Sequence, residues 1–81
     1  MTRDAVIARL LPIMETIFDE DDVAYSDDLT ADNIAEWDSL SHIRFMVAVE
    51  RAFEIRFSTG EIEGFKNAGE LVNAIVAKTQ G

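Results

Sequence analysis

The chain has 81 residues, of which 48% are hydrophobic, with no cysteine and a formal net charge of −9. This length suits one domain, residues 1–81, with one small core, and the hydrophobic fraction favours a folded chain over a disordered one. Disulfides and thiolate metal sites are excluded, and no apolar run approaches the roughly 20 residues of a membrane-spanning helix. We therefore expect a soluble, cytoplasmic protein.

The negative charge is concentrated in residues 19–38, which contain nine acids and no lysine or arginine. The rest of the chain has seven acids and seven bases and is neutral overall. Such a field repels nucleic acid and anionic membranes and favours partners with basic patches. An EF-hand loop starting at Asp19 is excluded, because Val23 and Ala24 occupy positions that need a ligand and a glycine.

The first helix is predicted over about residues 3–18, with Thr2 as its N-cap. Its apolar residues recur at helical spacing, and Pro12 interrupts the pattern. The sequence leaves open whether this segment is one bent helix or two short ones. The acidic segment 19–38 is too long for an ordinary turn, and its scattered apolar residues predict that it packs back onto the helices.

A second helix is predicted from Ser39 to Phe53 or Glu54, followed by an extended segment over residues 55–57. Ser58 and Glu61 form a capping box that begins a short third helix, ending near Gly64. A similar pattern, Asn67-x-x-Glu70, begins a fourth helix with a buried stripe of Leu71, Val72, Ile75 and Val76. The predicted fold class is all-α: a four-helix bundle with three main helices, one short helix and a long first connection.

The serine at position 39 has the most informative surroundings in the chain. Asp38 is a good N-cap for the second helix, which leaves Ser39 exposed in the first turn at the positive end of the helix dipole. A phosphate ester on Ser39 would be stabilised by that dipole and by unpaired backbone donors.

The apolar residues of the second helix divide between two faces. Phe45, Met46, Val49 and Phe53 share one arc and are predicted to face the core. The other face is an apolar strip that consists of Leu40, Ile43 and Val47. Two interpretations remain open: the long connection or the short helix covers the strip, or the strip contacts partner proteins. Residues bordering it are Ser39 and Glu50 on one side, and Arg44 and Arg51 on the other.

His42 is the only histidine, three residues after Ser39. A hydrolytic Ser-His pair lacks a glycine elbow and an oxyanion hole, so we expect His42 to be a surface residue and the protein not to be an enzyme.

Residues from about Glu36 to Ala77 resemble an acyl carrier protein. The similar features are Asp38-Ser39-Leu40, the Val-Glu pair at positions 49–50, Phe53 at the end of the second helix, and the spacing to Phe65 and the last helix. The resemblance implies that Ser39 carries 4'-phosphopantetheine, transferred from coenzyme A by a phosphopantetheinyl transferase with Mg²⁺. It also implies that Asp38 helps to engage the transferase and its metal.

The family's partner enzymes, which load and use acyl groups, meet positions that match Leu40, Ile43, Val47 and Glu50, with Arg44 and Arg51 at the rim. The acyl chain is expected between the second and third helices, near Met46, Ile62 and Phe65. The expected molecule is a monomer that binds no nucleic acid and does not span the membrane.

Two departures from the family pattern bear on the pathway. Arg44 and Arg51 stand where the carriers of fatty-acid synthesis commonly have acids, and Trp37 replaces a common glycine. These residues resemble discrete carriers of specialised polyketide or lipid pathways more than housekeeping fatty-acid carriers. The alternative from another class is an acidic helical interaction module without a prosthetic group, which would need a docking surface but no particular serine.

Overall fold

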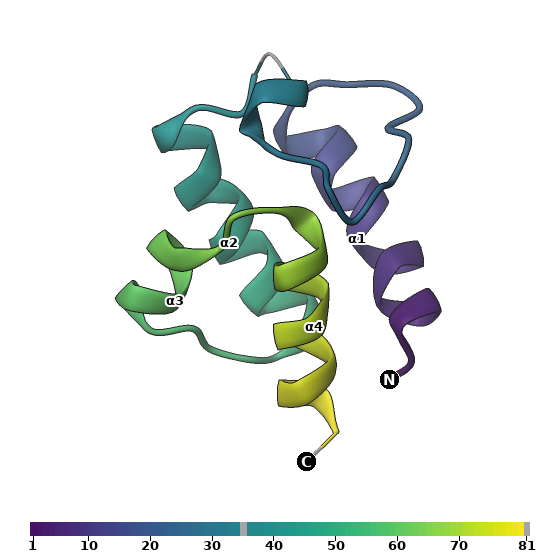
Figure 1. Cartoon of the computed structure of the whole chain (residues 1–81), viewed down its shortest axis with the longest axis vertical. Coiled ribbons are helices and arrows are strands. Elements are labelled where there is room, and N and C mark those ends of the chain that lie inside the picture. Colours follow the sequence, from purple (N-terminus) through teal and green to yellow (C-terminus); the bar gives the residue numbers. More distant parts are fainter. Residues whose placement is uncertain (35, 81) are drawn as a thin grey trace.

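A computed structural model describes residues 1–34 and 36–80 and confirms the all-α prediction. Three main α-helices, one short α-helix and a 3-10 turn follow one another in the described residues (Figure 1). The N-terminal end of α2 and the long first connection lie at one end of the molecule, and the start of α1 lies at the other (Figure 1). The element bounds are α1 (Arg3–Ile17), η1 (Ala31–Asn33), α2 (Ser39–Phe53), α3 (Thr59–Gly64) and α4 (Ala68–Thr79).

The first helix, α1, is one continuous helix that includes Pro12, which decides between the two alternatives for this segment. Thr2 is its N-cap, as predicted, and its hydroxyl accepts a hydrogen bond from the Ala5 amide at 3.1 Å. The ring of Pro12 is on the exposed side of the helix, while Leu10 and Met14 are fully buried. The hydrogen bond that Pro12 removes would go to the carbonyl of Ala8, and both residues are exposed, so it is lost on the solvent side of the helix.

The core lies between α1, α2 and α4, with α1 packed against the other two helices. All four residues predicted for the inner face of α2 are buried. The acidic connection contributes two buried residues, and Val23, Tyr25 and Trp37 pack against the core from the same segment, as expected. The buried residues are Val6, Leu10, Met14, Phe18, Leu29, Ile34, Phe45, Met46, Val49, Phe53, Ala68, Leu71, Val72 and Ile75.

The acidic connection is fixed to the N-terminal end of α4 by backbone hydrogen bonds. The amide of Ala68 donates to the Leu29 carbonyl at 2.8 Å, and the amide of Gly69 donates to the Asp27 carbonyl at 2.9 Å. These bonds satisfy amides that a helix start leaves without intrahelical partners. A Cβ atom on Gly69 would lie 2.9 Å from the Asp27 Cβ, so this close approach requires glycine.

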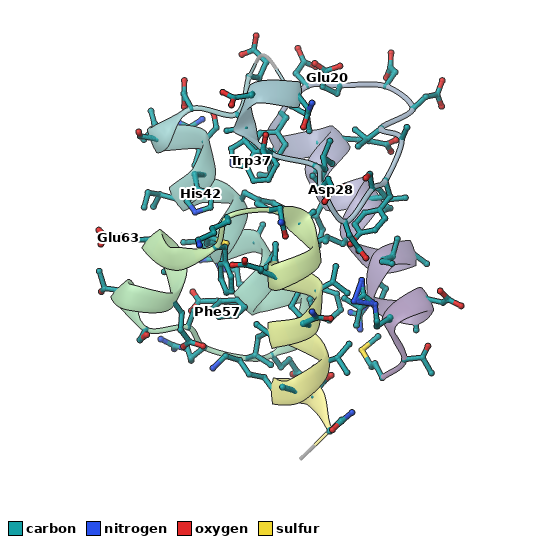
Figure 2. All side chains as sticks on the ribbon, in the orientation of Figure 1. Glu20, Asp28, Trp37, His42, Phe57 and Glu63 are labelled. Atoms are coloured by element: carbon teal, nitrogen blue, oxygen red, sulfur yellow. The ribbon has the colours of Figure 1, made fainter. Side chains whose placement is uncertain are left out.

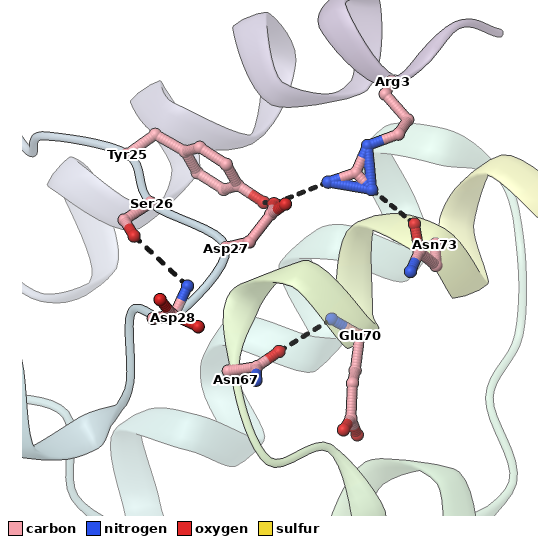
Figure 3. Close-up of polar contacts among 8 residues, drawn as sticks. All are labelled: Arg3, Tyr25, Ser26, Asp27, Asp28, Asn67, Glu70 and Asn73. Carbon is pink, nitrogen blue, oxygen red and sulfur yellow. Dashed lines mark hydrogen bonds and ion pairs between the residues drawn. The ribbon is translucent and has the colours of Figure 1, made fainter.

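A polar cluster ties the same connection to α1 and α4 (Figure 3). Asp27 accepts hydrogen bonds from the Tyr25 hydroxyl and from Arg3, and Arg3 also donates to Asn73 of α4. The bond from Tyr25, followed by that from Arg3, lowers the pKa of Asp27 below its ordinary value. Burial, followed by the bond to Asp27, raises the pKa of Tyr25 to about 12.

The segment between α2 and α3 is held by side chains at both ends. Glu54, in the left-handed conformation, ends α2, and a Glu50 carboxylate oxygen accepts from the Phe57 amide at 2.8 Å. Ser58 and Glu61 form the predicted capping box of α3. Lys78 of α4 pairs with Glu61 at 3.2 Å.

The start of α4 differs in one respect from the sequence prediction. Asn67 caps the helix by accepting from the Glu70 amide at 2.9 Å, as predicted. The Glu70 carboxylate, however, accepts from the Lys66 amide at 3.1 Å, one residue before the cap, so the expected reciprocal box is incomplete.

Candidate functional site

Ser39 is the first residue of α2, and its side chain is exposed. Asp38 caps the helix, as predicted, with its carboxylate accepting from the Ser41 amide at 2.8 Å. That hydrogen bond is the main reason why the pKa of Asp38 lies below its ordinary value. Within the described residues, the Ser39 hydroxyl has no hydrogen-bond partner, and it lies at the positive end of the helix.

An open groove of about 730 Å³ begins at Ser39 and runs between α2, α3 and the first connection. Ile43, Ile62 and Phe65 give its wall an apolar character, and Asp32, Glu63 and Lys66 contribute polar groups. The structure therefore brings two of the predicted acyl-pocket residues, Ile62 and Phe65, to the groove. The third, Met46, is fully buried in the core and does not line it.

His42 is half-buried, so its prediction as a surface residue was wrong. Its Nδ1 lies 3.0 Å from the Trp37 indole nitrogen, and its Nε2 lies 2.9 Å from the Ile62 carbonyl oxygen. An indole N–H only donates, so Nδ1 accepts and Nε2 carries the hydrogen that is donated to Ile62. Both ring nitrogens are occupied, which leaves His42 unable to act as a base for Ser39.

Trp37 connects this histidine to the core. Its ring stacks on Phe18 with centroids 4.9 Å apart and meets Phe45 edge-on at 5.8 Å. Figure 2 shows Trp37 and His42 in neighbouring positions, with Trp37 toward the centre of the bundle and His42 on α2. The indole thus packs against α1 while its N–H points to α2, a contact between distant segments that no local pattern indicates.

The apolar strip of Leu40, Ile43 and Val47, which we now call the α2 strip, is exposed along its whole length. Leu40, Ile43 and Val47 have exposed fractions of 64%, 52% and 42%, and among the described residues only Met1 is another large exposed hydrophobic side chain. The interpretation in which the connection or α3 covers the strip is therefore wrong.

The charged residues beside the α2 strip have different surroundings. Arg44 and Arg51 are exposed and form no ion pair within residues 1–34 and 36–80. Glu50 is half-buried and its carboxylate is already bonded to the Phe57 amide. A second hollow, lined by Val47, Glu50, Arg51, Glu54, Ile55 and Arg56, extends from the end of the strip.

Two features are absent from the described part of the chain. No group of three or more histidine, cysteine, aspartate or glutamate side chains is placed to hold a metal ion. No helix there is long and apolar enough to cross a membrane.

The chain is similar to a holo acyl carrier protein from Geobacter metallireducens, whose solution structure is known. The two are 35% identical and superimpose with a TM-score of 0.84, and the match covers 93% of this chain and 85% of the other. No family model and no curated protein matches the sequence. The helical fold and this match define the molecule as a carrier protein. At this identity and coverage, the chain belongs to the acyl carrier protein family, as the residues around Ser39 predicted.

Proposed function

We propose that this protein carries acyl intermediates as thioesters on a 4'-phosphopantetheine group attached to Ser39. The observation that carries the proposal is the exposed Ser39 hydroxyl at the N-terminal end of α2, which lines the groove and has no hydrogen-bond partner in residues 1–34 and 36–80. The residues fit the group, since a phosphodiester there gains from the helix dipole and the hydroxyl is accessible.

In the attachment reaction, the Ser39 oxygen attacks the pyrophosphate of coenzyme A. A bond forms between this oxygen and phosphorus, the P–O bond within the pyrophosphate breaks, and the adenosine-containing phosphate leaves. The serine proton goes to the transferase or to water. When bound, the group supplies a thiol that forms thioesters. Asp38 keeps Ser39 at the start of the helix through its bond to Ser41, and we propose that its carboxylate also faces the transferase's Mg²⁺.

Partner enzymes would dock on the α2 strip. The exposed Leu40, Ile43 and Val47 supply apolar area, with Glu50 on one border and Arg44 and Arg51 on the other. Because the two arginines have no ion-pair partner in the described residues, a partner with carboxylates opposite them would gain charge complementarity. We therefore propose partners of a specialised polyketide or lipid pathway rather than the common fatty-acid enzymes.

The acyl group would lie in the groove beside Ile62 and Phe65. Met46 is buried in the core and does not line the groove. Burial of its methylenes there would protect the thioester from water.

The test is intact-mass measurement after incubation with coenzyme A, Mg²⁺ and a broad-specificity phosphopantetheinyl transferase. The wild type should gain the mass of one phosphopantetheine group. Ser39→Ala should fold normally and gain nothing, while the matched control Ser41→Ala, which keeps the amide that Asp38 caps, should be modified. An unmodified wild type would favour the alternative, an acidic interaction module without a prosthetic group.

A further inference from the structure

The shortest helix, α3, depends on contacts from the rest of the molecule. It has six residues, far fewer than an isolated helix needs in water. The Ile62 carbonyl, near its C-terminal end, has no intrahelical partner to accept from, because the Lys66 amide four residues on donates to Glu70 instead. His42 of α2 fills this gap with its Nε2–H at 2.9 Å. The histidine therefore acts as a side-chain cap for the end of α3.

The same imidazole is held from its other side. The Trp37 indole donates to Nδ1 at 3.0 Å, and Trp37 is itself stacked on Phe18 next to the end of α1. This arrangement fixes both the ring orientation and the tautomer of His42. A continuous set of contacts thus joins the core, Trp37, His42 and α3 (Figure 2).

These contacts cross the space between α2 and α3, at the groove that begins at Ser39. His42 lies one helical turn after Ser39 and lines the same groove, so an acyl chain that the arm places in this groove lies beside it. The chain could pass from the open groove deeper between α2 and α3, beyond the His42–Ile62 contact, only if the Ile62 carbonyl moved away from His42. That movement would leave a donor and an acceptor, both part-buried, without partners.

We propose that His42 is a specificity-determining residue that latches α3 onto α2 and restricts the cargo to short acyl groups lying in the open groove. Longer chains would need the space between α2 and α3 that the latch keeps closed. This inference rests on the proposed attachment at Ser39, but the latch itself is a property of the unmodified protein.

Two substitutions separate the hydrogen bond from the bulk of the side chain. His42→Leu fills a similar volume without donor or acceptor. His42→Gln is the matched control, because its amide offers one donor for the Ile62 carbonyl and one acceptor for the Trp37 indole.

The first arm uses the unmodified protein and measures amide hydrogen exchange. His42→Leu should exchange the α3 amides about tenfold faster than the wild type, as expected for the loss of one hydrogen bond that limits local opening. His42→Gln should stay close to the wild type. Equal α3 exchange in all three proteins would overturn the latch, whether or not Ser39 is ever modified.

The second arm loads each protein from acetyl-, hexanoyl-, decanoyl- and palmitoyl-coenzyme A with the broad-specificity transferase. The thioester hydrolysis rate and the emission of Trp37, the only tryptophan, report entry of the chain. Each additional methylene that becomes buried should slow hydrolysis by up to about fourfold. In the wild type and His42→Gln, both signals should stop changing after the shorter chains, whereas in His42→Leu they should continue to change with the longer ones.

The cargo restriction is overturned if the wild type is protected progressively up to palmitoyl, or if His42→Leu and the wild type give the same dependence on chain length. If the hydrolysis rates of His42→Gln depend on chain length as those of His42→Leu do, side-chain shape and not the hydrogen bond restricts the cargo. Failure of every protein to accept any acyl group would refute the proposed function, and the cargo restriction with it, while the exchange measurement would still decide the latch.

Discussion

Val47 and Val49 are the same residue type, two positions apart on α2, yet their surroundings are opposite. Val47 is 42% exposed on the α2 strip, and Val49 is fully buried in the core. Changing each to glutamate therefore tests whether the strip is a docking surface or a second face of the core.

The expected effects on stability differ by several kcal/mol. Val47→Glu leaves its carboxylate in solvent and should change the free energy of unfolding by no more than about 0.5 kcal/mol, as for other surface substitutions. Val49→Glu loses about 1.5–3 kcal/mol of side-chain burial and places an unpaired charge in the core. Since 81 residues correspond to a total of roughly 4–12 kcal/mol, Val49→Glu should unfold most of the population.

The assay combines circular-dichroism melting with the rate of phosphopantetheine transfer. Val47→Glu should melt within about 4 °C of the wild type, because 1 kcal/mol corresponds to about 4–8 °C in a domain of this size. Its transfer rate should fall at least about tenfold if Val47 is a central docking residue for the transferase. Arg44→Glu and Arg51→Glu should alter partner choice more than overall affinity, because rim charges mainly affect encounter and discrimination.

Two results would refute this reasoning. If Val47→Glu melts like Val49→Glu, the strip is part of the core, and the proposed partner surface fails. If Val47→Glu melts normally and is modified at the wild-type rate, the transferase does not dock there. In both cases the role of Ser39 is tested separately by Ser39→Ala.

Three further predictions concern the acidic connection. Gly69→Ala should lower the melting temperature, because the new Cβ would lie 2.9–3.2 Å from Asp27 atoms and overpacking costs about 1–3 kcal/mol. The control is Gly60→Ala, where only the Ser58 hydroxyl lies near the new Cβ, at 4.0 Å. This substitution should raise the melting temperature, because alanine has the better helix propensity. A Gly69→Ala protein more stable than the wild type would show that the connection yields freely. Asp27 has a lowered pKa in the folded state. Its contribution to the free energy of unfolding is therefore complete at pH values above the pKa of the unfolded state, and it is lost as the pH falls through the pKa of the folded state. The stability difference between wild type and Asp27→Asn should be constant above about pH 5 and shrink in acid. Calorimetry in which this difference grows on acidification would contradict the assigned sign. Salt at about 0.15 M should raise the melting temperature by screening the nine acids of residues 19–38, and an unchanged melting curve would show that they are too far apart to interact.

Much of the backbone was predictable because the determinants are local. Thr2, Asp38, Ser58 and Asn67 each cap the helix that follows them, and all four were identified from their spacing to the next residues. Helical periodicity likewise separated the buried face of α2 from the exposed strip. The exposure of Ser39 followed from its place in the first turn, without knowledge of the rest of the fold.

Several tertiary contacts were not predictable, because their partners are separated in the sequence. By helix propensity alone, Gly69 is an unfavourable residue. The reason for a glycine is the backbone of Asp27, which lies 42 positions earlier in the sequence and packs against it. Glu50 was assigned to partners, and the structure shows it bonded to the Phe57 amide, so its change would disturb the fold as well as any interface.

His42 is the strongest case of this limit. A histidine three residues after Ser39 has two obvious interpretations, as a base or as a surface residue, and the structure contradicts both. Its role depends on an indole five residues before it and a carbonyl twenty residues after it, which meet only when α3 has folded against α2. Trp37 likewise differs from the glycine common in the family, and here its side chain fills space next to Phe18 and orients the imidazole. The two residues act as a pair, so either change alone should free the end of α3, and changing both should add little further exchange.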